Sequence, residues 1–153
     1  MSLWDNILKI FTGTVERPSP SDIVPTGNIT HVDNLVTISL DRLNVPLTKS
    51  PKVWIPMVPD TNSMDGWFDF GNNNILIAGA DEGEQKILID FIKVGDIAVY
   101  QIPNKIYAIH QVIKMGIDSR GRWLKFKGIN NPTGDPYLVR DEHIKWLSIG
   151  TIY

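Results

Sequence analysis

The stretch KIYAIHQVIKMGIDSRGRWLKFKGI, residues 105–129, indicates the fold most directly. Two runs rich in β-branched and aromatic residues flank the segment GIDSRGR, which supplies Asp, Ser and Gly for a turn. We therefore expect Tyr107–Met115 and Arg122–Gly128 to pair as neighbouring strands. The alternation of the second run predicts that Leu124 and Phe126 face the core.

Short runs of the same texture follow one another from residue 28 to the end of the chain. They read LVTISL, KVWIPMV, NILIAGA, KILIDFI, DIAVYQI and HIKWLSIGTIY, and Gly, Asn, Asp and Pro separate them. The stretch NNNILIAGADEGEQKILIDFI, residues 72–92, is expected to form an extra hairpin. Residues 28–153 are therefore predicted to form one mainly β, compact domain of barrel-like or sandwich type.

The first 27 residues differ from this β pattern. A helical spacing of apolar residues predicts a short amphipathic helix over residues 1–12, with Trp4, Ile7, Leu8 and Phe11 on one face. Residues 13–27 hold three prolines among Ser, Thr and Gly, which predicts a linker. We expect the helix to pack on the β domain or on a neighbouring copy, so that a homo-oligomer could form through it.

Composition narrows the class of protein. The chain has 153 residues, 42% of them hydrophobic, which suits one domain with an adequate core. A net charge of −2 provides no overall electrostatic attraction to nucleic acid or to an anionic membrane. The absence of cysteine excludes disulfides and thiol catalysis. Apolar runs such as ILIAGA fall short of the roughly 20 residues that a membrane span needs. We expect a soluble protein, cytoplasmic or virion-associated, without a membrane span.

Other binding chemistries find little support. The segment RGRWLKFKG mixes four cations with aromatic residues, but simple alternation explains it, with Trp123, Lys125 and Lys127 facing outward. The three histidines show no metal-ligand spacing, and GADEGEQK does not fit a phosphate-binding loop. We expect no nucleic-acid partner, no metal and no cofactor.

Two further residues raise the question of catalysis. Ser63 lies in PDTNSMDGWFDFG, residues 59–71, and His110 interrupts an apolar strand run. A serine is a poor nucleophile unless a base takes its proton and donors receive the oxyanion, so neither residue alone indicates an enzyme.

The order of the motifs carries more weight. PDTNSMDGWFDFG, VGDIAVYQ, YAIHQVI and KGINNPTGDPYLV resemble, in sequence, four blocks of the signal peptidase I and LexA-like serine peptidase superfamily. These are a Ser-Met nucleophile turn, a Gly-Asp pair that opens a strand, a strand with the general base, and a turn followed by an aspartate. The resemblance covers residues 56–153.

The base places the chain beside one branch of that superfamily. Bacterial signal peptidases and LexA-type repressors have a lysine on this strand, whereas archaeal and endoplasmic-reticulum signal peptidases have a histidine, as this chain does at His110. An imidazole suits the task because its unperturbed pKa of about 6.5 leaves the neutral base form abundant at neutral pH.

The resemblance implies a set of site residues. Ser63 would be the nucleophile, His110 the base, and Asp135 the group that orients the imidazole. The backbone N–H of Ser63 and the hydroxyl of Thr61 would receive the oxyanion. In the histidine branch a second aspartate lies six residues before the position of Asp135, and this chain has Ile129 there.

Two functions of different class follow from these residues. The first is a serine endopeptidase that holds an extended polypeptide against a strand edge, with small side chains preferred beside the scissile bond, as the resemblance implies. The second is an inactive relative whose β domain and N-terminal helix bind a protein partner in a phage or viral assembly. The departures at Gly66, Gln111 and Ile129 favour the second, and the retained Ser63 and His110 favour the first.

Overall fold

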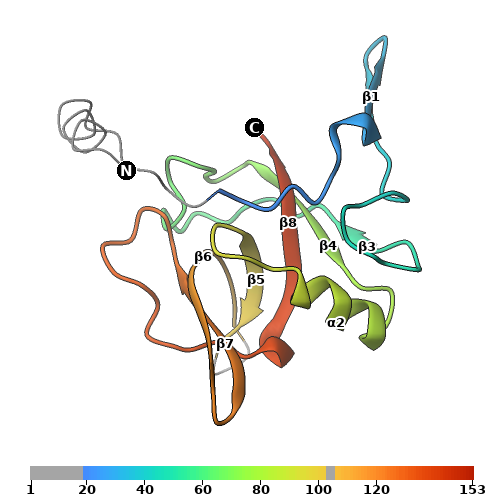
Figure 1. Cartoon of the computed structure of the whole chain (residues 1–153). Coiled ribbons are helices and arrows are strands. Elements are labelled where there is room, and N and C mark those ends of the chain that lie inside the picture. Colours follow the sequence, from blue (N-terminus) through green and yellow to red (C-terminus); the bar gives the residue numbers. More distant parts are fainter. Residues whose placement is uncertain (1–18, 103–105) are drawn as a thin grey trace, which may run out of the picture.

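The computed structural model describes residues 19–102 and 106–153, and these residues form a mainly β protein (Figure 1). The helix predicted over residues 1–12 and residues 13–18 of the predicted linker lie outside the described residues.

Six strands form one sheet in the order β3-β4-β8-β5-β6-β7, with every neighbouring pair antiparallel. Their bounds are Lys52–Trp54 for β3, Asn73–Ala78 for β4, Ile97–Gln101 for β5, Tyr107–Asp118 for β6, Gly121–Lys127 for β7 and Ile144–Ile152 for β8. Within residues 19–102 and 106–153 no pairing joins β3 to β7, so the sheet is open and is not a closed barrel.

The hairpin predicted at the centre of the chain is confirmed. β6 and β7 pair from Gln111 opposite Lys127 to Asp118 opposite Gly121. Gly121 has a φ of 99°, which glycine adopts without a steric penalty, and so it lets the chain reverse after two residues. The predicted orientation of the side chains also holds, because Leu124 and Phe126 are completely buried.

The strand predicted at residues 86–92, and with it the extra hairpin, is wrong. This segment belongs largely to the helix α2, Glu82–Asp90. Asp81 caps the helix by accepting a hydrogen bond from the backbone N–H of Glu84 at 3.0 Å. A short apolar run does not distinguish a buried strand from a helix, whereas the pair Asp81 and Glu84 is a signal for a helix start.

The main core lies between α2 and the sheet. Leu88, Ile89 and Ile92 are buried there against side chains from β4 to β8. Ile23 enters the same core from residues 19–27, and the Ser21 hydroxyl donates to Asp96 at 2.8 Å. The described part of the predicted linker is therefore anchored to the β domain.

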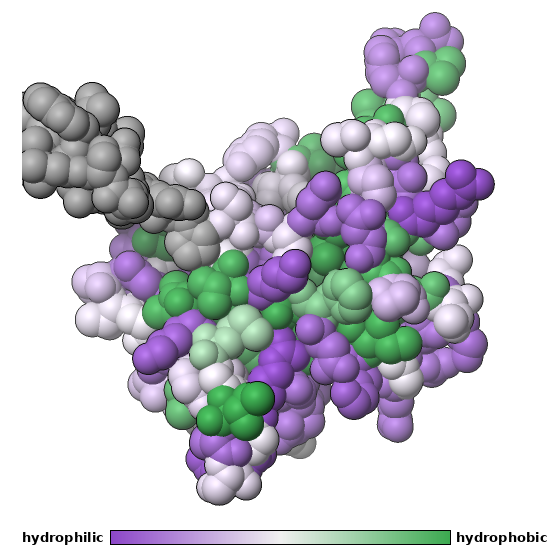
Figure 2. Space-filling view, in the orientation of Figure 1, coloured by the Kyte–Doolittle hydropathy of each residue, from purple (hydrophilic) through white to green (hydrophobic). Residues whose placement is uncertain are grey.

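A separate hairpin stands clear of this body (Figure 1). It consists of β1, Ile29–Val32, and β2, Leu35–Ile38, and it follows the short 3-10 helix η1, Thr26–Asn28. Hydrophobic and hydrophilic side chains lie side by side on it (Figure 2). A second 3-10 helix, η3, Asp141–His143, precedes β8. In the part of the chain that the structure describes, every helix is too short or too polar to cross a membrane.

Candidate active site

Ser63 lies on the loop of residues 55–72, which connects β3 to β4. Met64 and Phe68 fix this loop, since both are buried in a small apolar cluster with Val58 and Ile97. Asn62 has a φ of 55°, a left-handed conformation that asparagine tolerates better than most residues. The sharp turn at Asn62 directs Met64 into the cluster and leaves the Ser63 hydroxyl at the surface of the loop.

Three of the predicted site residues meet in one chain of hydrogen bonds. The Ser63 Oγ lies 3.1 Å from Nε2 of His110, and Nδ1 of the same ring lies 2.7 Å from Oδ2 of Asp135. An ionised carboxylate only accepts hydrogen bonds, so Nδ1 carries a proton. In the neutral ring Nε2 then has a free lone pair directed at the serine hydroxyl.

Asp135 is held by groups from three strands, β5, β6 and β7. It lies on the loop after β7, is 9% exposed, and donates its backbone N–H to the Phe126 carbonyl at 2.8 Å. The Tyr100 hydroxyl, from β5, donates to the same Oδ2 at 2.6 Å. Burial alone would raise the pKa of Asp135, but the hydrogen bonds from His110 and Tyr100 outweigh it, and the pKa lies below its ordinary value. Asp135 is therefore an anion beside the imidazole.

Thr61 lies on the same loop as the serine. Its Oγ1 is 3.2 Å from the Ser63 Oγ. If Ser63 attacked a carbonyl group, a hydroxyl at this distance could donate a hydrogen bond to the oxygen that develops charge.

The turn after β7 holds the backbone of the serine loop through hydrogen bonds. The backbone N–H of Asn130 donates to the Ser63 carbonyl at 3.0 Å, and the Asn130 side chain donates to the Asn62 carbonyl at 2.9 Å. Gly128 passes so close that a Cβ there would come within 2.6 Å of the Ser63 carbonyl oxygen. The position of Ser63 therefore depends on this turn.

The structure shows the surroundings of the three residues that differ from the resembled superfamily pattern. Ile129 packs against the small apolar cluster around Met64, whereas Asp135 is the carboxylate that contacts His110. Gln111 donates from Nε2 to the Gly95 carbonyl at 3.0 Å. Gly66 has a φ of 87°, which the proline ring cannot adopt.

A pocket of about 270 Å³ opens beside Ser63 and His110. Its apolar walls come from Val58, Met64, Phe68 and Ile109.

The same pocket borders a strand edge. The bond from the Val112 N–H to the Asp96 carbonyl, 2.8 Å long, shows that even-numbered residues of β6 bond toward β5. The backbone groups of Tyr107 and Ile109 therefore point to the opposite edge. β7 pairs with β6 only from Gln111 onward, so within residues 19–102 and 106–153 no strand covers that edge beside the pocket.

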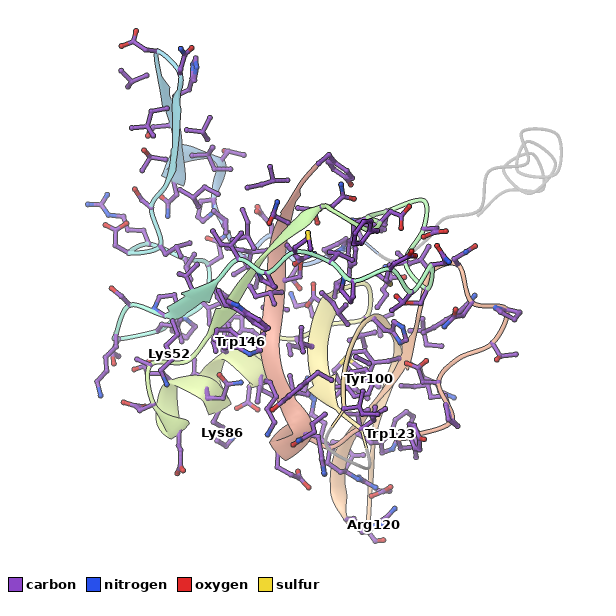
Figure 3. The ribbon with its side chains drawn as sticks, turned by 180° about the vertical axis from the view of Figure 1, so that it is seen from behind. Lys52, Lys86, Tyr100, Arg120, Trp123 and Trp146 are labelled. Atoms are coloured by element: carbon purple, nitrogen blue, oxygen red, sulfur yellow. The ribbon has the colours of Figure 1, made fainter. Side chains whose placement is uncertain are left out.

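The sequence pattern does not predict the hydrogen bond from Tyr100 to Asp135. Tyr100 lies among the side chains gathered around β5 and β6 (Figure 3). In the sequence it belongs to the run DIAVYQI, whose pattern predicts only a core residue. The only signal in the sequence was general: a buried tyrosine needs a partner for its hydroxyl. Among residues 19–102 and 106–153, no group of three or more His, Asp or Glu is placed to hold a metal ion.

Comparisons of this chain with protein-family models, with curated proteins and with solved structures found no match.

Proposed function

We propose that this protein is a serine endopeptidase of the signal peptidase and LexA-like type, in which Ser63 is the nucleophile and His110 the general base. The observation that carries the proposal is the hydrogen-bonded series from Ser63 through His110 to Asp135, with distances of 3.1 and 2.7 Å. Three residues from distant parts of the sequence meet in the order that nucleophilic acyl transfer requires.

The proposed reaction begins when the Ser63 Oγ attacks the carbonyl carbon of the scissile peptide bond. Nε2 of His110 takes the hydroxyl proton, and Asp135 stabilises the imidazolium through Nδ1–H. The Thr61 hydroxyl and the Ser63 backbone N–H donate to the developing oxyanion. His110 then gives its proton to the leaving amine, and a water molecule, activated by the same base, releases the acyl group from the serine.

The uncovered edge of β6 supports a polypeptide as substrate. The N–H and C=O groups of Tyr107 and Ile109 would bind an extended chain by adding it as a strand. Such backbone pairing brings a peptide carbonyl to Ser63 without requiring a particular sequence. The pocket of about 270 Å³ beside the serine would receive one side chain next to the scissile bond.

The test is the cleavage of an unstructured polypeptide by purified protein. We expect Ser63→Ala to abolish cleavage and to leave the melting temperature nearly unchanged, because a hydroxyl in a surface loop contributes little to folding. Thr61→Val should lower kcat by about 10²-fold through loss of an oxyanion donor. Ser119→Ala, in the exposed turn between β6 and β7, is the matched control and should cleave like the wild type.

Two results would contradict the proposal. If Ser63→Ala cleaves as fast as the wild type in a preparation free of other proteases, Ser63 is not the nucleophile. If the wild type cleaves no member of a broad peptide library, and His110→Ala changes only stability, the chain is the inactive, assembly-related protein instead.

A further inference from the structure

We infer that Tyr100 is a positioning residue that holds Asp135 in the orientation His110 needs, so that the site is a series of four residues. This inference rests on the proposed function, because a positioning role has a catalytic consequence only if Ser63 and His110 cleave peptides. The observation behind it is that two donors, the Tyr100 hydroxyl and Nδ1 of His110, meet on one oxygen of Asp135, at 2.6 and 2.7 Å.

The phenol ring of Tyr100 has little freedom to move. Tyr100 is 1% exposed, and its ring stacks on Phe126 with the centroids 4.4 Å apart. The Phe126 carbonyl also accepts the backbone N–H of Asp135 at 2.8 Å. One residue of β7 therefore fixes both the donor and the acceptor of the Tyr100 hydrogen bond.

The pairing of β5 with β6 places Tyr100 and His110 on the same side of the sheet. His110 lies opposite Ala98 in the antiparallel pair of β5 and β6, and Ala108 lies opposite Tyr100. Because alternate residues of a strand share one face, Tyr100 and His110 project from the same side of the sheet. Their ring centroids are 6.4 Å apart, close enough for one carboxylate to bridge them.

The charge balance around Asp135 agrees with this arrangement. Burial, and then the hydrogen bond to Asp135, raise the pKa of Tyr100, so the phenol keeps its proton and remains a donor at neutral pH. His110 from β6 and Tyr100 from β5 contact the carboxylate, the charge of Lys125 on β7 also lowers the pKa of Asp135, and Tyr137 contributes to the raised pKa of Tyr100. Tyr100 thus stabilises the ionised form of Asp135 without bringing a competing charge.

The consequence for the base is a fixed orientation of its ring. With Oδ2 held by Tyr100, the carboxylate cannot rotate away from Nδ1, and the imidazole keeps its proton there. Nε2 then keeps its lone pair toward the Ser63 hydroxyl. Without Tyr100 the carboxylate could turn, and a fraction of the molecules would have Nε2 out of line with Ser63.

The experiment replaces Tyr100 by phenylalanine, which keeps the ring and its stacking on Phe126 but removes the hydroxyl. Two measurements are made: the cleavage kinetics of an unstructured polypeptide, which give kcat and KM, and the titration of the Asp135 carboxyl carbon by NMR. Tyr137→Phe is the matched control, since it removes a hydroxyl from an exposed tyrosine on the loop that carries Asp135.

For Tyr100→Phe we expect kcat to fall about tenfold, the loss expected for one hydrogen bond to a charged group, with KM unchanged. The titration midpoint of Asp135 should rise. Tyr137→Phe should match the wild type in both measurements. A Tyr100→Phe protein with a wild-type kcat, or with a wild-type Asp135 titration, would overturn the inference.

A second change keeps the test decisive if Tyr100→Phe folds poorly. Site-specific incorporation of 3-fluorotyrosine at position 100 preserves the shape and makes the phenol a stronger donor, so the Asp135 titration midpoint should fall below that of the wild type. An unchanged midpoint would refute the role of Tyr100. The NMR titration does not depend on cleavage, so the failure of the proposed peptidase activity and the failure of the Tyr100 inference give different results.

Discussion

Replacing Gly128 by alanine tests whether the turn after β7 sets the position of Ser63, the proposed nucleophile. The added Cβ would lie 2.6 Å from the Ser63 carbonyl oxygen and 2.7 Å from Nδ2 of Asn131. Ordinary contact begins near 3.4 Å, so the turn and the serine loop must separate by 3.4 − 2.6 = 0.8 Å. The first contact is a backbone atom, which a change of side-chain rotamer cannot relieve.

The separation should weaken the bonds that Asn130 makes to Ser63 and Asn62. A displacement of about 1 Å in a reacting group costs about 10²-fold in rate, so we expect kcat for polypeptide cleavage to fall by about that factor. The added methyl should also cost about 1 to 3 kcal/mol of unfolding free energy.

The assay compares kcat and urea unfolding of Gly128→Ala with those of Gly27→Ala. Gly27 is the control because a Cβ there meets no atom within 4 Å and its φ is not positive. Should Gly128→Ala show the kcat and the stability of the wild type, the turn would not determine where Ser63 lies, and the reasoning would be refuted.

Two further predictions concern stability. The pKa of Asp135 is lower in the folded state than in the unfolded state, so its contribution to stability is complete above its ordinary pKa and is lost as the pH falls through the lower, folded value. Urea unfolding should therefore show that the stability advantage of the wild type over Asp135→Asn shrinks below about pH 4, whereas a constant difference would argue against an ionised Asp135. Leu88→Ala should cost about 3 kcal/mol because the side chain is buried between α2 and the sheet, whereas exposed Lys86→Ala should cost little; equal losses would contradict the packing of the helix.

The sequence predicted those parts of the fold that depend on local pattern. The β6 and β7 hairpin followed from alternation on both sides of a turn, and the inward positions of Leu124 and Phe126 are confirmed. The strand predicted at residues 86–92 was wrong because a short apolar run, here Ile87, Leu88 and Ile89, fits a buried strand and a buried helix equally well. The capping residue Asp81 would have decided between them.

For the candidate site, the resemblance of four motifs, in order, to a serine peptidase superfamily implied that Ser63, His110 and Asp135 belong together, and the structure has these three residues in hydrogen-bond contact. The sequence could not predict the hydrogen bond from Tyr100 to Asp135, because the partner of a buried hydroxyl is set by the packing of β5 against the loop after β7. The anchoring of residues 19–27 was hidden for a similar reason. A stretch rich in proline looks like a linker whether or not one of its side chains, here Ile23, enters the core.

The assembly of the site also has a consequence for the order of folding. Ser63 and His110 are 47 residues apart along the chain, and Asp135 is a further 25 residues from His110. Contacts between such distant segments form after local ones, because closing a long loop costs entropy before any contact repays it. A chain that has formed only the β6 and β7 hairpin has its histidine in place but no serine beside it. The series from Ser63 to Asp135 is therefore completed late, when the loop of residues 55–72 docks on the turn at Gly128, and under the proposed function an incompletely folded chain would lack peptidase activity.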